Sequence, residues 1–284
     1  MERKRIELAT LLQKKAKGEK ITMLTAYDAP TARALDDAGI DTLLVGDSAG
    51  NVVLGYRDTR PVTMDEMIVL TSAVARGTRW AYVIGDMPFM SYNATRAEAI
   101  RNAGRFVKEA GAEAVKLEGG GPMAGTLQAI VQAGIPVVGH LGLTPQTVGM
   151  LGGYRVQGKS AENAARIVRD ALELESAGAC MLVLEMVPDR VAALISRRLK
   201  IPTIGIGSGP DCDGQVLVVH DMLGVRAGFT PKFVKRYAAL GEEMERAAAE
   251  YKADVESLAF PAAAHSFAID DAEYARLESL VKDL

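Results

Sequence analysis

Residues 80–119 read WAYVIGDMPFMSYNATRAEAIRNAGRFVKEAGAEAVKLEG. Two short runs rich in apolar residues, 80–86 and 113–119, flank a segment, 95–111, whose apolar residues recur at helical spacing. Val, Ile and Leu dominate such runs when a strand is buried on both faces of a parallel sheet. An Ala-Gly pair closes the helical segment just before the second run, as in the short loop between a helix and the next strand. This stretch therefore predicts one strand–helix–strand unit.

The same unit repeats along the chain in both directions from residues 80–119. Helical periodicity also marks 29–39, 160–178 and 187–199. Eight apolar runs are candidate strands: ITMLTAY, DTLLVG, WAYVIGD, EAVKLEG, IPVVGHLG, CMLVLEM, IPTIGIG and QVLVVHD. No linker rich in Pro or Ser divides the chain, and α/β barrels of about 250 residues form single domains.

We therefore predict an α/β fold, a single-domain (β/α)8 TIM barrel. The barrel with an N-terminal helix is expected over residues 1–267. A C-terminal extension, 268–284, is expected to be helical or disordered and to lie outside the barrel.

Composition excludes several classes of function. A net charge of -3 without a basic stripe argues against nucleic-acid binding. No apolar run approaches the roughly 18 residues of a membrane span, and the charged N-terminal stretch has no apolar signal core. The protein is therefore expected in the cytoplasm, without membrane or nucleic-acid partners.

The two cysteines, Cys180 and Cys212, are too few for a disulfide framework or a thiolate zinc site. Cys180 lies in an apolar run and is expected to be a buried small hydrophobe. Cys212 lies in the polar stretch SGPDCDGQ, where a reactive thiol is conceivable, but no histidine is near it in sequence. Nucleophilic catalysis by cysteine is not expected.

Polar residues at the ends of the apolar runs are the candidates for chemistry, because TIM barrels build their active sites at the C-terminal ends of the strands. The candidates are Asp28, Asp47, Asp86, Glu118 and Glu185, joined by Lys116 and His140. Carboxylates converging on one rim repel one another unless a cation lies among them, and oxygen ligands favour Mg²⁺ or a similar ion. Alternatively, each acid caps the N-terminus of the following helix.

A metal-assisted reaction of a small oxygen-rich substrate follows from this acid cluster. A metal chelated by the keto oxygen and carboxylate of an α-ketoacid would ease proton removal from the adjacent carbon, with one free carboxylate as base. His140 is either a structural histidine or a hydrogen-bonding support for the site. The glycine-rich pieces EGGGP and GIGSGPDCDGQ match no nucleotide-binding motif and are expected to form turns.

Ten motifs resemble those of ketopantoate hydroxymethyltransferases, the first committed enzymes of pantothenate synthesis. In chain order they are LTAYDAP, LLVGDSAGNVVLGY, PVTMDEM, DMPFMSY, AVKLEGG, VVGHLGLTPQ, GGYRVQGK, LVLEMVP, IPTIGIGSG and DGQVLVVHDMLG. The resemblance runs from about residue 22 to residue 267, and GHLGLTPQ followed by GGYRVQG is a specific combination.

The resemblance implies a role for each matching residue. Asp47 and Asp86 would bind the metal and the chelated substrate, with Glu118 a third metal ligand, directly or through water. Ser48 and Lys116 would contact the substrate carboxylate. Glu185 would be the base that removes a proton from C3 of α-ketoisovalerate, and the enolate would attack the methylene carbon of 5,10-methylenetetrahydrofolate.

The resemblance also implies a homo-oligomer, a decamer in this family, acting on small-molecule substrates. One loop departs from the family pattern, since Ser208, Pro210 and Cys212 stand where other residues are common. The loop contacts near folate are therefore left open.

Two other functions remain as alternatives. A metal-dependent carbon–carbon lyase of the phosphoenolpyruvate mutase and isocitrate lyase type would use a similar barrel, but its catalytic KKCGH-like loop is absent from the sequence. A non-catalytic ligand-binding barrel would bind metal and ketoacid without turnover, yet it would not require a base such as Glu185.

Overall fold

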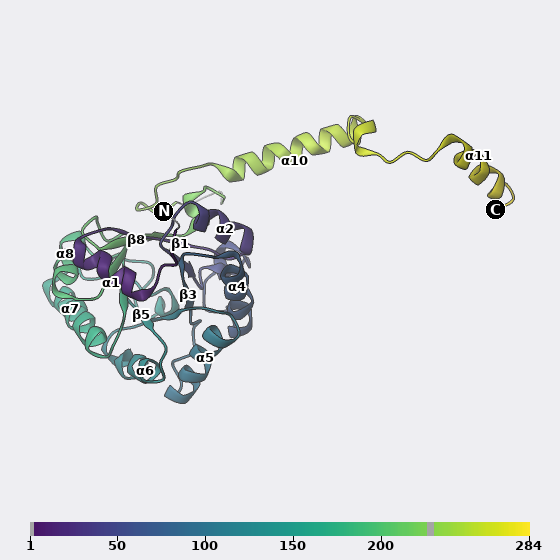
Figure 1. The fold of residues 1–284 in the computed structure, drawn as a ribbon. Helices are drawn as coiled ribbons and strands as arrows, with labels where there is room; N and C mark the ends of the chain where they lie inside the picture. Colours follow the sequence, from purple (N-terminus) through teal and green to yellow (C-terminus); the bar gives the residue numbers. More distant parts are fainter. Residues whose placement is uncertain (1–2, 226–229) are drawn as a thin grey trace.

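A computed structural model describes residues 3–225 and 230–284. Within these residues, eight parallel strands pair in chain order and close into a barrel, β8 hydrogen-bonding to β1 (Figure 1). The strands are β1 (Ile21–Thr25), β2 (Thr42–Val45), β3 (Tyr82–Asp86), β4 (Ala114–Glu118), β5 (Val137–Gly142), β6 (Met181–Glu185), β7 (Thr203–Ile206) and β8 (Gly214–Leu217). Seven of the eight predicted runs contain a whole strand and the eighth overlaps β8, which begins one residue before it; the predicted TIM barrel is confirmed.

Helices surround the barrel, and the four predicted helical segments are confirmed as α2, α5, α7 and α8. The α-helices are α1 (Leu8–Lys17), α2 (Ala29–Asp37), α3 (Ala49–Val52), α4 (Met64–Gly77), α5 (Arg96–Lys108), α6 (Gly121–Gln132), α7 (Ala161–Ser176), α8 (Asp189–Arg198), α9 (Val219–Met222), α10 (Leu240–Glu256) and α11 (Asp271–Leu280). Two short 3₁₀ turns are η1 (Pro145–Thr147) and η2 (Ala263–His265). Thr63, Thr95 and Ser160 start α4, α5 and α7 by accepting a hydrogen bond from a backbone N–H of the first turn.

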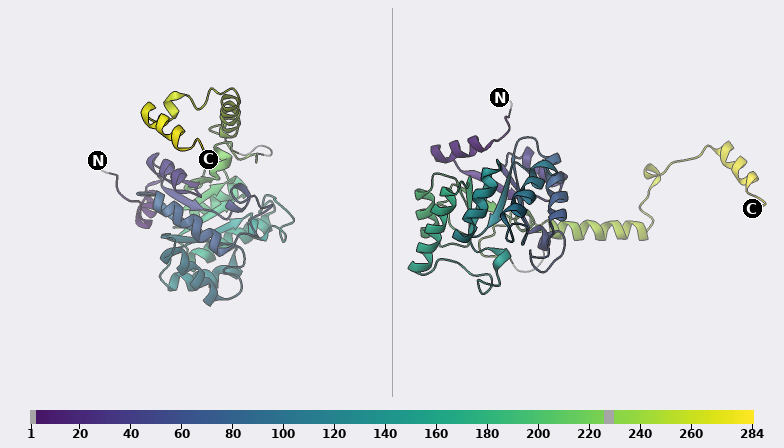
Figure 2. Two further views of the ribbon diagram at one scale, coloured as in Figure 1. Left: turned by 90° about the vertical axis from the view of Figure 1, so that its right-hand side faces the viewer. Right: turned by 90° about the horizontal axis from the view of Figure 1, so that it is seen from below.

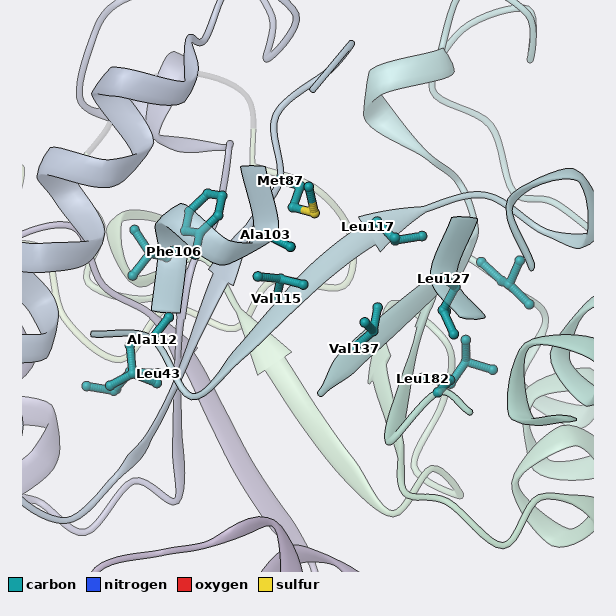
Figure 3. Close-up of a cluster of buried hydrophobic side chains, with 14 of the residues drawn as sticks. Leu43, Met87, Ala103, Phe106, Ala112, Val115, Leu117, Leu127, Val137 and Leu182 are labelled. Carbon is teal, nitrogen blue, oxygen red and sulfur yellow. The ribbon is translucent and has the colours of Figure 1, made fainter. Parts of the chain in front are cut away.

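The hydrophobic core has two layers because strand side chains alternate between the two faces of the sheet. Side chains that point inward, such as Met23, Ile84 and Val183, fill the barrel. Side chains that point outward, such as Val115 and Leu182, pack against the surrounding helices (Figure 3). Both layers are buried, so the barrel is a packed core with its polar groups at the ends of the strands.

Helix α1 covers the N-terminal end of the barrel, where Leu11 joins the inner core. Its neighbouring lysines reach the starts of the two strands that flank β1: Lys14 Nζ lies 2.6 Å from Asp41 Oδ1, just before β2, and Lys15 Nζ lies 2.6 Å from Asp213 Oδ2, just before β8. Thr22 donates its backbone N–H and its hydroxyl to Asp41, at 2.9 Å each. These contacts tie α1 to the N-terminal ends of β1, β2 and β8.

The C-terminal part of the chain, from α10 onward, extends away from the barrel as an arm (Figures 1 and 2). The helical extension expected at 268–284 contains α11, but the chain leaves the barrel near Leu240, earlier than the expected boundary at residue 267. Alpha-helical periodicity in α10 matched that of a barrel helix, yet none of its described side chains is buried. In the described parts of the chain, no helix is long and apolar enough to cross a membrane.

Candidate active site

The polar residues predicted from the strand ends lie inside the C-terminal end of the barrel. On β4, Lys116 and Glu118 follow Ala114 at two-residue spacing and therefore share its inward direction. His140 follows Val138 on β5 in the same way, and Glu185 follows Val183 on β6. The apolar inner layer thus forms the floor of the site, and the next inward position carries the chemistry.

Lys116 is the cation at the centre of this cluster. Its Nζ lies 2.7 Å from Asp86 Oδ1, 3.7 Å from Glu118 Oε1 and 3.4 Å from His140 Nδ1. Strand register produces these contacts, because Asp86 is paired with Lys116 and Glu118 with His140 on neighbouring strands. The lysine side chain is 4% exposed, so its charge is neutralised mainly by these carboxylates.

His140 connects Glu118 to Glu185. Its Nδ1 lies 3.2 Å from Glu118 Oε1, and its Nε2 lies 3.3 Å from Glu185 Oε2. Burial alone would lower the His140 pKa and Lys116 lowers it further, but hydrogen bonds to the two glutamates raise it to about 9. At neutral pH, His140 is therefore a cation between two carboxylates, and its predicted hydrogen-bonding role agrees with this geometry.

Gly142 allows β5 and β6 to approach at this point. Its φ is +97°, and a Cβ there would lie 2.1 Å from the backbone oxygen of Glu185. That oxygen accepts a hydrogen bond from the Leu143 backbone N–H at 2.8 Å. A residue other than glycine would displace Glu185 from its position beside His140.

The carboxylates carry more negative charge than the neighbouring cations balance easily. Burial raises the pKa of Asp47 well above its usual value, and the charges of Asp86 and Glu118 raise it further. Burial also raises the pKa of Asp86, although Lys116 opposes this shift. Burial alone would raise the pKa of Glu118, but His140 and Lys116 lower it. Asp47 is therefore the carboxylate whose ionisation is most costly in the metal-free site.

Gln146 and Tyr92 were not among the predicted site residues, although both lie within the quoted motifs. The Gln146 side-chain Nε2 donates to Asp47 Oδ2 at 3.0 Å, and its backbone N–H donates to Glu118 Oε2 at 3.0 Å. Tyr92 Oη donates to Gln146 Oε1 at 2.6 Å. Both side chains are 1% exposed. A polar residue just after a strand usually lies in a solvated loop, and the sequence pattern carried no sign that Gln146 is buried.

The candidate residues border a common pocket at the C-terminal end of the barrel. The pocket is lined by Asp47, Ser48, Asp86, Lys116, Glu118, His140 and Glu185. Ser48 precedes α3 and its Oγ lies 2.8 Å from Tyr27 Oη, which fixes the hydroxyl at the pocket wall. Glu185, with 17% of its side chain exposed, is more accessible than Asp86 or Glu118.

The prediction that Asp28 belongs to the acid cluster is wrong. Asp28 is exposed and caps α2, accepting hydrogen bonds from the backbone N–H and the hydroxyl of Thr31, both at 2.8 Å. The helix-cap alternative explains this position, because the chain turns outward after Tyr27.

In the loop that departs from the family pattern, Ser208 and Cys212 are buried and Pro210 is exposed. Ser208 lines the pocket, donates to the Leu184 backbone oxygen at 2.7 Å and accepts from the Val187 N–H at 3.1 Å. Cys212 is 0% exposed, and burial raises its pKa, so it is not poised as a thiolate nucleophile. Cys180 is buried, as expected.

The acidic residues of the pocket are the candidates for holding a divalent cation. Among residues 3–225 and 230–284, no group of three or more His, Cys, Asp and Glu side chains is already arranged to hold a metal. Both carboxylate oxygens of Glu118 are engaged by His140 and the Gln146 N–H. Asp47 and Asp86 also have partners: Asp47 Oδ2 accepts from Gln146 Nε2, Asp86 Oδ1 lies 2.7 Å from Lys116 Nζ, and Asp86 Oδ2 accepts from the Asp47 backbone N–H at 3.0 Å. A carboxylate oxygen has more than one acceptor site, and Mg²⁺ commonly uses one or two carboxylates together with water and substrate. The carboxylate oxygens at this site are the kind of donor that Mg²⁺ prefers, and Asp47 and Asp86 are the residues that could hold it.

Sequence comparisons relate the chain to enzymes of one family. Residues 5–263 match the sequence model of the family described as ketopantoate hydroxymethyltransferase. The chain is 56% identical over 263 residues to 3-methyl-2-oxobutanoate hydroxymethyltransferase of Acetivibrio thermocellus, covering 93% of each chain. It is 53% identical to the enzyme of the same name from Syntrophomonas wolfei, covering 96% of this chain and 99% of the relative.

Solved structures with similar folds are much more distant in sequence. A phosphonopyruvate hydrolase aligns with a TM-score of 0.62 at 13% identity, covering 97% of this chain and 95% of the hydrolase. A 2,3-dimethylmalate lyase of the phosphoenolpyruvate mutase/isocitrate lyase superfamily aligns with a TM-score of 0.57 at 15% identity, covering 96% of this chain and 98% of the lyase. At these identities the likeness concerns the barrel fold alone.

Proposed function

The chain belongs to the ketopantoate hydroxymethyltransferase family, and on that premise we propose that it transfers a hydroxymethyl group from 5,10-methylenetetrahydrofolate to α-ketoisovalerate, giving ketopantoate and tetrahydrofolate. One observation carries the proposal: buried Asp47 and Asp86 lie beside Lys116, while the more accessible Glu185 stands apart across His140. This arrangement separates a substrate-holding group of residues from a base. Such a separation is what proton removal next to a carbonyl requires.

The ketoacid would bind at the end of the pocket where Asp47, Ser48 and Lys116 converge. Ser48 can donate a hydrogen bond to the substrate carboxylate, since its Oγ is already held by Tyr27. Lys116 supplies positive charge close to the same oxygens. These contacts would orient the C3–H of the substrate toward Glu185.

Glu185 is the proposed base. It takes the proton from C3 of α-ketoisovalerate, and the carbanion so formed attacks the methylene carbon of the folate, where one C–N bond breaks as the new C–C bond forms. Water then displaces the remaining folate nitrogen from that carbon and supplies the hydroxyl oxygen, so that ketopantoate and tetrahydrofolate are released. His140 holds Glu185 Oε2 at 3.3 Å and can donate a hydrogen bond to it, which keeps the carboxylate turned into the pocket.

We propose Mg²⁺ as the cofactor, held by Asp47 and Asp86, with Glu118 contributing through water. Mg²⁺ bound there would polarise the keto oxygen of the substrate. A divalent cation would also offset the repulsion among Asp47, Asp86 and Glu118 that raises the pKa of Asp47.

Deuterium exchange at C3 of α-ketoisovalerate, followed by NMR, tests this function directly. The expected result is exchange that depends on Mg²⁺ and stops with a chelator, and ketopantoate formation that begins when methylenetetrahydrofolate is added. Folded, metal-loaded protein without exchange would contradict the proposal. Cleavage of a carbon–carbon bond without folate would instead support the lyase alternative.

We further propose that the protein is a homo-oligomer, a decamer as in its family, assembled through the C-terminal arm. On α10, Leu240, Met244, Tyr251 and Val255 recur at spacings of four and seven residues and form one exposed apolar face. The outward face of the barrel at the β1–β8 junction retains exposed Thr22 and Gln215, so the arm of a second copy has a strand surface to cover.

Assembly is measured by size-exclusion chromatography with light scattering. Replacing Met244 and Tyr251 together with Glu should reduce the mass toward that of one chain, because both side chains lie on the apolar face of α10. Ala253→Glu, on the opposite face of the same helix, is the matched control and should leave the mass unchanged. Equal masses for the wild type and the double variant would show that the arm does not contribute to oligomer formation.

A further inference from the structure

We infer that Gln146 is a positioning residue that fixes the relative placement of Asp47 and Glu118, with Tyr92 locking its side chain. This inference rests on the proposed function, because it concerns two carboxylates of the proposed metal site. Asp47 follows β2 and Glu118 ends β4, so these two residues belong to strands that are not neighbours in the sheet. A single residue from η1 spans both.

The Gln146 amide uses each of its polar ends. Its Nε2 donates to Asp47 Oδ2 at 3.0 Å and to the Met87 backbone oxygen at 2.9 Å, while Oε1 accepts from Tyr92 Oη at 2.6 Å. The opposite orientation of the amide would place its oxygen against two acceptors. Its partners therefore determine which way the amide points, and the N–H end faces the carboxylate.

Tyr92 connects this amide to β4. Its hydroxyl accepts a hydrogen bond from the Glu118 backbone N–H at 3.1 Å and donates to Gln146. The Gln146 backbone N–H in turn donates to the side chain of Glu118. Gln146 and Tyr92 thus hold Glu118 through both its backbone and its carboxylate, in addition to holding Asp47.

Burial makes this network rigid. Gln146, Tyr92, Asp47 and Glu118 are between 1% and 4% exposed, so water cannot replace a lost partner easily. The donor from Gln146 occupies Asp47 Oδ2, which leaves Oδ1 as the oxygen offered to a cation. The glutamine therefore sets the direction from which Asp47 can bind a metal, although Gln146 itself does not contact the reacting atoms.

Two variants separate positioning from general support of the fold. Gln146→Met keeps a side chain of similar length without its polar atoms, and Tyr92→Phe removes one oxygen. Tyr82→Phe is the matched control, because Tyr82 is also a buried tyrosine, 3% exposed, whose hydroxyl donates to a backbone oxygen, that of Glu113 at 3.2 Å. Tyr82 lies at the start of β3, at the opposite end of the strand from Asp86.

Mn²⁺ binding, followed by electron paramagnetic resonance without ketoacid or folate, is the deciding measurement, with urea unfolding in parallel. Partners that orient metal ligands are worth about 10- to 100-fold in metal affinity, so Gln146→Met and Tyr92→Phe should weaken Mn²⁺ binding by about tenfold or more. Tyr82→Phe should bind Mn²⁺ like wild type. At saturating metal, the two site variants should lose more in kcat than in KM, because the carboxylates are displaced rather than removed.

Wild-type Mn²⁺ affinity in both folded site variants would overturn the positioning role and leave the proposed function standing. Equal weakening in Tyr82→Phe would also overturn it, since the effect would then follow from stability. Absence of Mn²⁺ binding in the wild-type protein would overturn this inference together with the proposed metal, and C3 exchange without metal would then decide the proposed reaction separately.

Discussion

The two ends of the barrel use the same residue type in opposite ways. At the N-terminal end, Asp41 and Asp213 each lie 2.6 Å from a lysine of α1 and accept hydrogen bonds from the N–H and hydroxyl of a threonine. At the C-terminal end, Asp47, Asp86 and Glu118 surround one lysine. Burial and like charges raise the pKa of Asp47 there.

The two ends differ in how many carboxylates share one cation: Asp41 and Asp213 each have their own lysine, whereas Asp86 and Glu118 share Lys116 and their charges raise the pKa of Asp47. A carboxylate whose oxygens are paired with a cation and N–H donors stabilises the fold. A carboxylate crowded by others binds a cation or a proton readily, at a cost in stability. Substitutions can change each end of the barrel separately, and activity and the free energy of unfolding report the effect.

Glu185→Gln is expected to have the largest effect on activity. General bases contribute about 10²- to 10⁴-fold to rate, so C3 exchange and ketopantoate formation should fall by that factor. The free energy of unfolding, measured in urea, should change little because Glu185 is partly exposed and its contact with His140 can be kept by glutamine. Unchanged C3 exchange in this variant would contradict the assignment of the base.

The pH dependence of stability tests the C-terminal end in the wild-type protein. Hydrogen bonds to Glu118 and Glu185 raise the pKa of His140 from 6.5 to about 9 in the fold, against burial and the charge of Lys116. Protonated His140 therefore stabilises the fold fully below pH 6.5, and this contribution is lost as the pH rises through about 9.

The expected loss of unfolding free energy between pH 7 and pH 10 is on the order of 2 kcal/mol, measured by urea unfolding without metal. His140→Gln should give a flatter profile over this range. Identical pH profiles for the two proteins would mean that another group carries the dependence.

Asp41→Asn and Asp213→Asn test the N-terminal end. Each removes a charged acceptor that serves a lysine and a threonine, so unfolding free energy should fall by about 1 to 2 kcal/mol. Activity of the folded variants under saturating substrate should equal that of wild type, because neither residue faces the catalytic acids. A clear drop in kcat with normal stability would show that contacts at the N-terminal end of the barrel affect the active site at the C-terminal end.

Asp47→Asn should change stability in the direction opposite to Asp41→Asn and Asp213→Asn. Because burial and the charges of Asp86 and Glu118 raise the pKa of Asp47, its ionised form opposes folding as the pH rises through that pKa. Removing the charge should raise the unfolding free energy measured without metal at neutral pH. The variant should also lose the stabilisation that Mg²⁺ gives wild type; a destabilised variant would contradict this account.

Most of the fold could be predicted from sequence because each strand is a short apolar run and each αβ loop carries a local signal. Residues 80–119 contain the whole repeating unit, and β3 and β4 form there. The path of α10 could not be predicted, because a helix that packs on its own barrel and one that extends away have the same periodicity. Periodicity indicates that an apolar face exists and does not indicate what covers it.

The acids of the site could be predicted because the end of each apolar run shows where a strand ends. Asp47, Asp86, Lys116, Glu118, His140 and Glu185 were found in this way and lie together. The same rule wrongly included Asp28, since a helix cap also follows a strand. Gln146 and the Lys14–Asp41 pair were missed because their importance depends on contacts between distant parts of the chain.

The neighbouring lysines of α1 also bear on how the barrel is made during translation. Lys14 and Asp41 are 27 residues apart, whereas Lys15 and Asp213 are 198 residues apart. A nascent chain that has released β2 can already form the first ion pair, but the second must wait until most of the protein has left the ribosome. The first pair can therefore form before the barrel closes, whereas the second requires the chain as far as Asp213.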